Sequence, residues 1–306
     1  MKVLITGATG KLGCELCKDF SAEGDVAGLA RGNRETKLCR ASEILAADIT
    51  DRDRVIRIVR DFKPGIVINS AAIADVDFCE LNPEQAFAVN AEGAKNVADA
   101  ATAAGALLIH ISTDYVFDGE KGSAYTEEDR PNPVSVYGDS KLAAEDYIRS
   151  SSGRYIIIRS SWMFGGCGKN FVDFVVDAAK RGEKIKAVYE KSGSPTYTVD
   201  LAKAIFDLAT KMKQDNPAVA GRSASLRRAP SGIYNVTNAG VCSRYEFAKE
   251  ILDLCKLKAE VIAITAKEAG GPAARPKLSA LDNTRIGKAL GYKLRHYREA
   301  CKDYLK

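Results

Sequence analysis

The first half of the chain alternates short apolar runs, many of them rich in β-branched residues, with longer segments of helical periodicity. Short apolar runs predict strands, and apolar positions that recur every three or four residues predict helices. The predicted strands are Lys2–Thr6, Asp25–Leu29, Glu43–Ala46, Ile66–Asn69, Leu107–Ser112 and Arg154–Arg159. The predicted helices are Leu12–Ala22, Arg52–Phe62, Pro83–Ala104 and Val136–Ser150. Apolar strands separated by helices indicate an α/β fold with a doubly wound, Rossmann-type parallel sheet.

The pattern becomes less regular in the second half of the chain. It predicts helices at Asn170–Arg181, Thr198–Met212, Ser243–Cys255 and near Asn283–Leu290, strands at Lys184–Val188 and Gly232–Val236, and an exposed loop at Gln214–Gly232. We therefore expect a dinucleotide-binding domain at residues 1–165, rejoined by about 196–213. Residues 166–195 and 214–306 are expected to form a smaller α/β substrate-binding region over the carboxyl edge of the sheet, where ligands of such folds bind.

Composition narrows the functional classes. The 45 basic and 40 acidic residues of the 306-residue chain balance to +5, too even to indicate nucleic-acid binding. The sequence shows neither an apolar run long enough to span a membrane nor a signal peptide, which predicts a cytoplasmic protein. Cys14 and Cys17 form a C-x-x-C, but without a second pair or a nearby histidine they predict apolar helix positions and no metal site. His110 is expected to pack inside its strand.

A glycine-rich turn directly follows the first predicted strand and opens the first helix. Its glycines, Gly7, Gly10 and Gly13, are spaced as G-x-x-G-x-x-G. Glycines let the backbone approach a pyrophosphate, and the helix N-terminus offers free N–H groups and a positive dipole end. The turn therefore predicts a dinucleotide site that includes Thr9, Lys11 and Leu12, the residues between the glycines.

The residues after the second strand bear on the choice of nicotinamide cofactor. An NAD site usually has a carboxylate there, whereas this chain has Arg31 and Arg34. Because arginine suits a 2′-phosphate, NADPH is favoured, with NADH as the alternative. Asp48, after the third strand, either accepts a hydrogen bond from the adenine or caps the following helix.

Tyr137 and Lys141 lie four residues apart on a predicted helix, so their side chains share one face. A neighbouring ammonium favours the phenolate and lowers the pKa of a tyrosine, which can then protonate a carbonyl oxygen as hydride reaches the carbon. The fifth strand ends in Ser112 and Thr113, and either hydroxyl could orient that carbonyl. The three elements together predict a nicotinamide-dependent reductase.

The chain resembles the dTDP-4-dehydrorhamnose reductase family of extended short-chain dehydrogenase/reductases over nearly its whole length. The residues that carry the resemblance are 4–13 (LITGATGKLG), 86–90 (AFAVN), 112–119 (STDYVFDG), 137–141 (YGDSK), 159–165 (RSSWMFG), 194–202 (SPTYTVDLA) and 275–276 (RP). The resemblance implies NAD(P)H-dependent reduction of the 4-keto group of a nucleotide-activated deoxysugar. The implied substrate is dTDP-4-dehydro-L-rhamnose, and the implied product is dTDP-L-rhamnose.

By the same resemblance, Thr113, Tyr137 and Lys141 are the catalytic residues, and Lys141 also contacts the nicotinamide ribose. The remaining cofactor contacts are expected at Ile49, Ala71, Ala72 and Asn90, and the substrate contacts at Val76, Trp162, Asn170 and Arg275. A homodimer is one assembly that the resemblance allows. One departure is Ala74-Asp75-Val76-Asp77, where relatives often have Thr-Ala-Val-Asp, and this difference bears on which sugar is used.

Three alternatives use similar residues. A sugar-nucleotide dehydratase would have a glutamate after Asp114, where this chain has Tyr115. An epimerase uses the same tyrosine and lysine but consumes no NADPH. A nucleotide-binding regulatory subunit, like that of methionine adenosyltransferase, can keep both residues without turnover.

Overall fold

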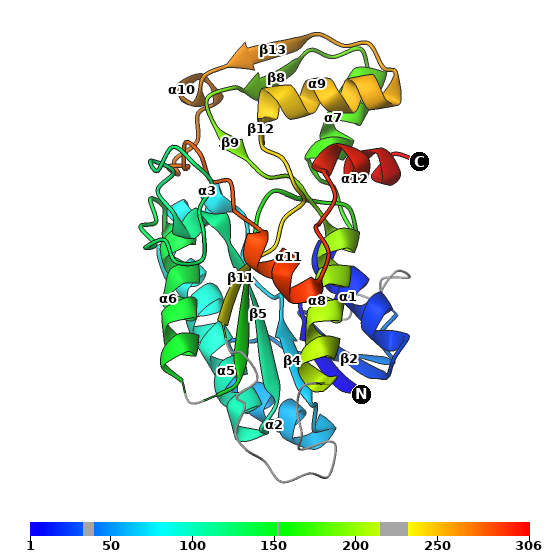
Figure 1. Cartoon of the computed structure of the whole chain (residues 1–306). Coiled ribbons are helices and arrows are strands. Elements are labelled where there is room, and N and C mark those ends of the chain that lie inside the picture. The colour runs from blue at the N-terminus through cyan, green and yellow to red at the C-terminus, as the bar shows by residue number, and fades with distance from the viewer. Residues whose placement is uncertain (33–39, 152, 215–231) are drawn as a thin grey trace.

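A seven-stranded parallel sheet forms the centre of the computed structural model, which describes residues 1–32, 40–151, 153–214 and 232–306. The strands lie in the order β11-β6-β5-β4-β1-β2-β3. Their bounds are β1 Lys2–Thr6, β2 Asp25–Ala30, β3 Glu43–Ala46, β4 Ile66–Asn69, β5 Leu107–Thr113, β6 Tyr155–Ser160 and β11 Gly232–Asn235. This arrangement confirms the predicted doubly wound α/β fold (Figure 1).

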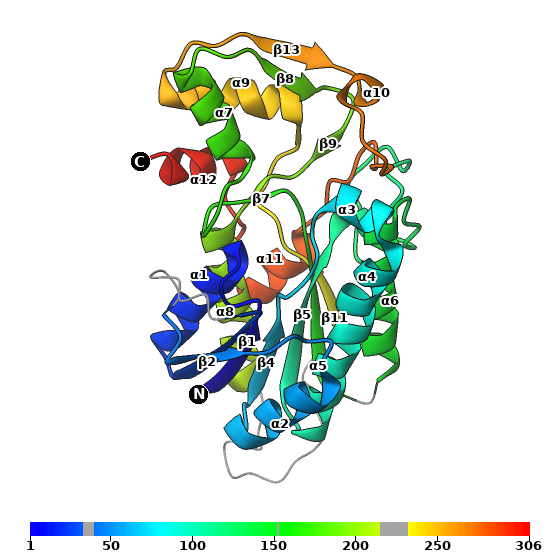
Figure 2. The same ribbon diagram turned by 180° about the vertical axis from the view of Figure 1, so that it is seen from behind.

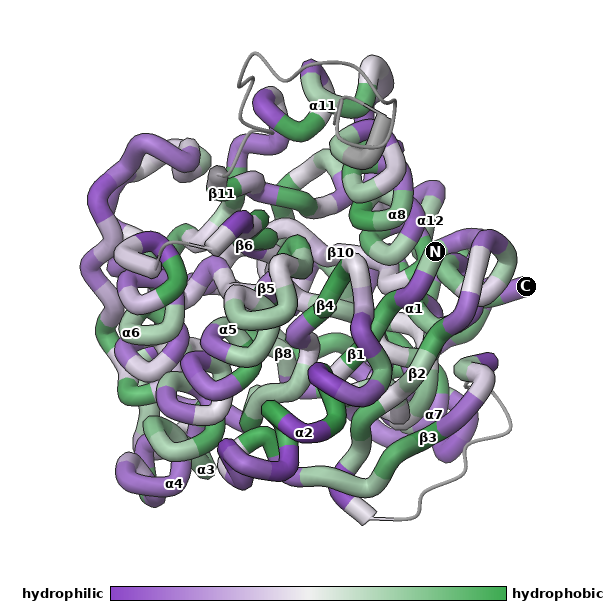
Figure 3. The backbone as a smooth tube through the Cα atoms, turned by 90° about the horizontal axis from the view of Figure 1, so that it is seen from below, coloured by the Kyte–Doolittle hydropathy of each residue, from purple (hydrophilic) through white to green (hydrophobic). Residues whose placement is uncertain are grey.

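Helices cover both faces of the sheet, because its central strands are apolar on both sides. One layer contains α2 (Arg52–Phe62), α5 (Ala94–Ala103) and α6 (Val136–Ser150). The other contains α1 (Lys11–Ser21), α8 (Thr198–Gln214) and α11 (Thr284–Leu290). Viewed along the strands, the sheet runs between the two layers (Figure 3). Two apolar cores result, one on each face of the sheet.

A smaller lobe lies beyond the carboxyl edge of the sheet (Figure 2). Its helices are α7 (Phe171–Lys180), α9 (Arg244–Cys255), α10 (Ala266–Ala269) and α12 (Tyr297–Tyr304). Its parallel strands β8 (Ile185–Val188) and β13 (Val261–Ile264) pair with each other. Short strands connect the lobes, namely β7 (Met163–Phe164), β9 (Ser192–Gly193), β10 (Thr196–Tyr197) and β12 (Cys242–Ser243). The lobe has its own apolar core, so it is a separate packing unit above the site.

The structure differs from the sequence expectations in two places that affect the site. The helix predicted at Pro83–Ala104 is divided into α4 (Pro83–Phe87), a π-helical turn (Ala88–Gly93) and α5, and it is preceded by an unexpected short helix, α3 (Val76–Leu81). Part of the expected smaller region, 214–306, belongs to the main sheet layer: β11 pairs with β6 in the main sheet, and α11 packs against β11 and α8.

Arg34 and nearly all of the predicted loop Gln214–Gly232 lie outside the described residues. Among the described residues, no helix is both long and apolar enough to cross a bilayer.

Candidate active site

The glycine turn packs too closely for larger side chains. Gly7 has a φ of +64°, and a Cβ there would lie 2.9 Å from the backbone nitrogen of Ala71. A Cβ on Gly13 would lie 2.1 Å from the Gly7 carbonyl oxygen. Gly10 is the N-cap of α1, and no side chain of the described residues caps this helix. The free N–H groups of its first turn therefore remain available for a phosphate, which fits the predicted dinucleotide.

A cavity of about 580 Å³ lies on the β2 side of this turn. It is lined by eight of the predicted cofactor residues, which are Gly7, Thr9, Gly10, Arg31, Asp48, Ile49, Ala71 and Ala72. Asp48 accepts hydrogen bonds from the backbone and the hydroxyl of Thr50, whereas Asp51 caps α2. The capping alternative for Asp48 is therefore wrong, and its carboxylate lies at the cavity wall together with the exposed Arg31.

A second cavity, of about 480 Å³, adjoins the first and shares Gly7, Gly10, Ser70 and Ala72 with it. Among the predicted residues that line it are Lys11, Leu12, Gly13, Val76, Thr113, Tyr137, Lys141 and Trp162. Residues from the glycine turn, α1, β5 and α6 thus meet at the carboxyl edge of the sheet, beneath the smaller lobe. The two adjoining cavities provide room for a dinucleotide and for a second ligand beside it.

Lys141 is almost fully buried although it lines the second cavity. Its Nζ donates to the Ile111 carbonyl oxygen at 2.6 Å and lies 3.2 Å from Nε2 of His110. Burial lowers the pKa of Lys141 to about 8, and the negative charge of Glu145 partly opposes this shift. His110 is a packed strand residue, as predicted, but it also contacts the candidate catalytic lysine.

Tyr137 and Thr113 face each other across the same cavity. Burial raises the pKa of the Tyr137 phenol, and a side-chain hydrogen bond with Thr113 offsets part of that rise. This differs from the expectation that Lys141 would lower the pKa of Tyr137, since the Lys141 amine is directed at Ile111 and His110 here. Ser112 also lines the cavity, but its hydroxyl donates to the buried Glu145 at 2.5 Å. Of the two candidate hydroxyls, Thr113 is the one beside Tyr137.

Sequence reasoning missed Arg244, which lines the cavity from the first turn of α9. Its guanidinium lies 3.9 Å from the centre of the Trp162 ring and 4.6 Å from that of Phe171. Trp162 itself has a φ of +43°, and its indole packs so closely on Gly193 that a Cβ there would lie 2.7 Å away. The only signal in the sequence was the Ser-x-x-Glu capping box that starts α9, which says nothing about the side chain after the cap.

Three predicted site residues lie outside both cavities. Asn90 uses its amide to bond the Ile73 backbone and the Ser140 hydroxyl, and so joins the β4 loop to α6. Asn170 caps α7 and donates to Tyr304. Arg275 forms an ion pair with Asp77 at 2.7 Å, between the C-terminal segment and α3.

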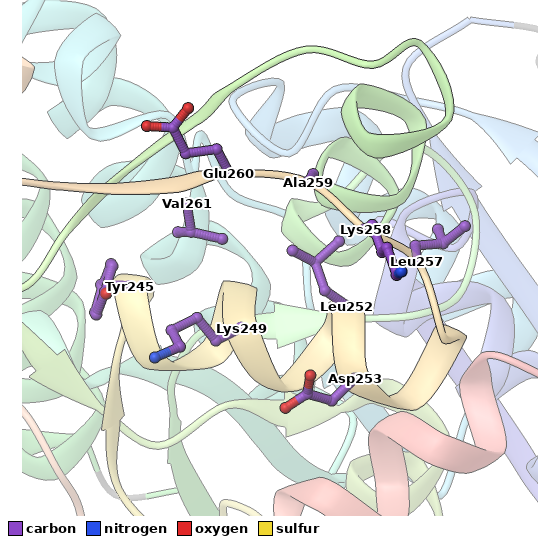
Figure 4. Close-up of a pocket in the computed structure, with 9 residues that line it drawn as sticks. All are labelled: Tyr245, Lys249, Leu252, Asp253, Leu257, Lys258, Ala259, Glu260 and Val261. Atoms are coloured by element: carbon purple, nitrogen blue, oxygen red, sulfur yellow. The ribbon is translucent and has the colours of Figure 1, made fainter.

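A separate hollow of about 510 Å³ lies on the smaller lobe between α9 and β13 (Figure 4). Leu252 and Val261 fill the space between helix and strand, and the surrounding lysines and carboxylates are surface residues. None of the predicted site residues lies there. In the described part of the chain, no cluster of histidine, cysteine and carboxylate side chains could hold a metal ion.

Known proteins match this chain over its full length. A family model described as "RmlD substrate binding domain" matches residues 1–306. The spore coat polysaccharide biosynthesis protein SpsK of Bacillus subtilis is 37% identical, covering 99% of this chain and 96% of that protein. The dTDP-4-dehydrorhamnose reductase of Aggregatibacter actinomycetemcomitans is 35% identical, covering 99% and 97%. A solved dTDP-4-dehydrorhamnose reductase of Bacillus anthracis, in complex with NADP, has a TM-score of 0.82 and 32% identity, covering 99% and 98%.

Proposed function

The chain belongs to the dTDP-4-dehydrorhamnose reductase family and is an NADPH-dependent sugar-nucleotide reductase; on this premise we propose that it reduces dTDP-4-dehydro-L-rhamnose to dTDP-L-rhamnose. One observation carries the proposal. Thr113, Tyr137 and Lys141 come from β5 and α6 and line one cavity that adjoins the glycine turn. That placement brings a proton donor beside a dinucleotide site, as reduction of a ketone requires.

When bound, NADPH supplies the hydride that reaches C4 of the sugar. Tyr137 donates its phenolic proton to the carbonyl oxygen, which becomes the new hydroxyl. Thr113 orients this oxygen and the phenol through its hydrogen bond with Tyr137. Lys141 holds the nicotinamide ribose and returns a proton to the phenolate. Because the resting phenol is buried and its pKa is raised, Tyr137 holds its proton until negative charge develops on the substrate.

The substrate end of the cavity suits an anionic nucleotide sugar. Lys11 from α1 and Arg244 from α9 both line the cavity and supply positive charge. Arginine held between two aromatic rings keeps its donors in a fixed plane, which suits a diphosphate. We assign Trp162 to the face of the sugar. We assign Arg275, which is paired with Asp77 at 2.7 Å, to the nucleotide end of the substrate.

The test is a turnover assay with dTDP-4-keto-6-deoxy sugar and either NADPH or NADH. Turnover is measured as the loss of reduced-nicotinamide absorbance, and the sugar product is then identified. Tyr137→Phe removes the proton donor and should lower kcat by roughly 10²–10⁴-fold. Tyr115→Phe is the matched control, since its ring packs edge-on against Tyr137 at 5.7 Å but carries no assigned proton transfer.

The outcomes separate the alternatives. Product at C4 with stoichiometric NADPH loss supports the reductase, whereas interconversion of sugars without NADPH loss identifies an epimerase. A stable complex with another protein and no turnover identifies a regulatory subunit. Equal activity of Tyr137→Phe and the unmodified protein refutes the role of Tyr137.

A further inference from the structure

A buried chain of side chains connects the glycine turn to Lys141, beneath the two cavities. Thr6 Oγ1 lies 2.6 Å from the side-chain oxygen of Asn69, whose amide nitrogen lies 3.1 Å from Nδ1 of His110. Nε2 of His110 then lies 3.2 Å from Nζ of Lys141. All four residues are at most 2% exposed. The chain crosses three neighbouring strands, β1, β4 and β5, before it reaches α6.

The direction of the hydrogen bonds in this series of side chains is fixed at the Thr6 end. The backbone N–H of Ala71 donates to Thr6 Oγ1 at 3.2 Å, and a backbone N–H cannot reverse its role. The Thr6 hydroxyl already has this donor, so its own proton goes to the Asn69 oxygen, because a buried hydroxyl proton without an acceptor is costly. The Asn69 amide nitrogen is thereby turned toward His110 and donates to Nδ1.

The tautomer of His110 follows from this direction. Burial holds the pKa of His110 well below its usual range, so the imidazole is neutral. A neutral imidazole has one N–H and one acceptor nitrogen. Since Nδ1 accepts from Asn69, the proton lies on Nε2 and points at Lys141. An ammonium at Lys141 would face this N–H with another N–H, whereas a neutral amine accepts from it.

We propose that Thr6, Asn69 and His110 are positioning residues that stabilise the neutral amine of Lys141 relative to its ammonium, so that both forms are accessible near neutral pH. The amine donates one N–H to the Ile111 carbonyl oxygen and accepts the Nε2–H of His110 with its lone pair. Its second N–H is left for the cavity that Lys141 lines. The consequence for catalysis rests on the proposed function: Lys141 takes a proton from solvent and passes it to the Tyr137 phenolate, giving phenol and amine.

Several charged or titratable groups face Lys141 from the elements packed around it. His110 comes from β5, Tyr137 and Glu145 come from its own helix, and Arg159 of β6 pairs with Glu145. Glu145 is the group that favours the ammonium, and burial opposes it. In the proposal, the Nε2–H of His110 opposes it as well. Burial and Glu145 together give Lys141 a pKa of about 8, within reach of neutral pH, where an acid–base group is most effective.

The test compares Thr6→Val with Thr6→Ser in the full-length protein without ligands. Valine has the shape of threonine but no hydroxyl, so the Asn69 amide is free to turn over and present its oxygen to His110. Nε2 of His110 then becomes an acceptor and favours the ammonium of Lys141. Thr6→Ser keeps the hydroxyl and is the control. The readout is the NMR titration of the Lys141 ε-carbon in ¹³C-lysine-labelled protein, assigned by loss of the signal in Lys141→Met.

We expect Thr6→Val to raise the pKa of Lys141 by about one unit, a tenfold change in its protonation equilibrium, and Thr6→Ser to leave it unchanged. His110→Gln should also raise the pKa of Lys141, because the glutamine amide can turn its carbonyl oxygen to Lys141. This variant decides the question if Thr6→Val does not fold. Titration of Thr6→Val at or below the pKa of the unmodified protein overturns the proposal. This readout needs no turnover. If the pKa of Lys141 rises in Thr6→Val as expected but the unmodified protein has no reductase activity, only the proposed function is refuted.

Discussion

The buried ion pair between Arg159 and Glu145 gives the sharpest prediction about stability. The two side chains are 1% and 0% exposed. Arg159 donates from Nε at 2.9 Å and from Nη2 at 2.5 Å, and the Ser112 hydroxyl donates to the same carboxylate at 2.5 Å. Arg159→Met keeps the length of the side chain and removes the guanidinium. Glu145 would then be a buried carboxylate that keeps the Ser112 hydrogen bond but has lost its ion-pair partner.

The expected loss follows from this burial. Removing one partner of a buried pair costs about 3–5 kcal/mol of unfolding free energy, whereas an exposed pair contributes about 0–1 kcal/mol. Arg149→Met is the matched control, because Arg149 and its partner Asp146 are 50% and 61% exposed. Urea unfolding at neutral pH, analysed by linear extrapolation, measures both losses on the same scale.

A double variant tests the cause of the loss. If the unpaired carboxylate is responsible, Arg159→Met with Glu145→Leu should recover most of the stability, because apolar residues of similar volume often replace a buried ion pair at little cost. A loss in Arg159→Met no larger than in Arg149→Met would refute the reasoning. So would a double variant as unstable as the single one, since the damage would then come from packing against Phe117, whose ring lies 5.0 Å from the guanidinium.

Three further predictions concern ligand binding and pH. Arg244→Leu should raise KM for the nucleotide sugar by about 10–100-fold through loss of charge-assisted hydrogen bonds, with KM for NADPH as the internal control in steady-state assays. Arg31→Ala should raise KM for NADPH about tenfold while leaving that for NADH nearly unchanged, because only NADPH carries a 2′-phosphate. Burial raises the pKa of the Asp114 carboxyl to about 6, so the folded protein holds this proton more tightly than the unfolded chain. The contribution of this proton to stability is complete below about pH 4 and is lost as pH rises through about 6. Relative to Asp114→Asn, the unfolding free energy measured in urea should therefore fall by about 3 kcal/mol over this range.

The elements of the first half could be predicted because their sequence signals are local. Strands β1, β3 and β4 match their predicted bounds, β2 and β5 end one residue later than predicted, and β6 is shifted by one residue. The long helix predicted from residue 83 was less accurate, because the π-helical turn at Ala88–Gly93 interrupts an apolar pattern that looks continuous. In the second half, the pairing of β11 with β6 joins segments more than 70 residues apart. No local pattern specifies which sheet such a strand will join.

The candidate site could be predicted where its residues follow a strand or share a helix face. Thr113, Tyr137 and Lys141 are of this kind, and so is the glycine turn. Arg244 could not be found this way, because it reaches the cavity through the fold of the smaller lobe and has no motif of its own. Asn170 has a role that the resemblance did not suggest: its side chain caps α7, while its contact with the substrate stays a prediction.

The ionisation of Tyr137 and Lys141, the proposed catalytic pair, depends on information that spacing does not contain. A spacing of four residues suggests a Lys141 ammonium that lowers the pKa of the Tyr137 phenol, yet burial raises the pKa of Tyr137 and lowers the pKa of Lys141. A buried amine also takes its charge state from whatever donates to it, and here that donor is His110 on a different element. His110 in turn takes its tautomer from the Ala71 backbone through Thr6 and Asn69. The glycine turn that shapes the cofactor cavity and the lysine that serves the chemistry are therefore linked through the interior of the sheet.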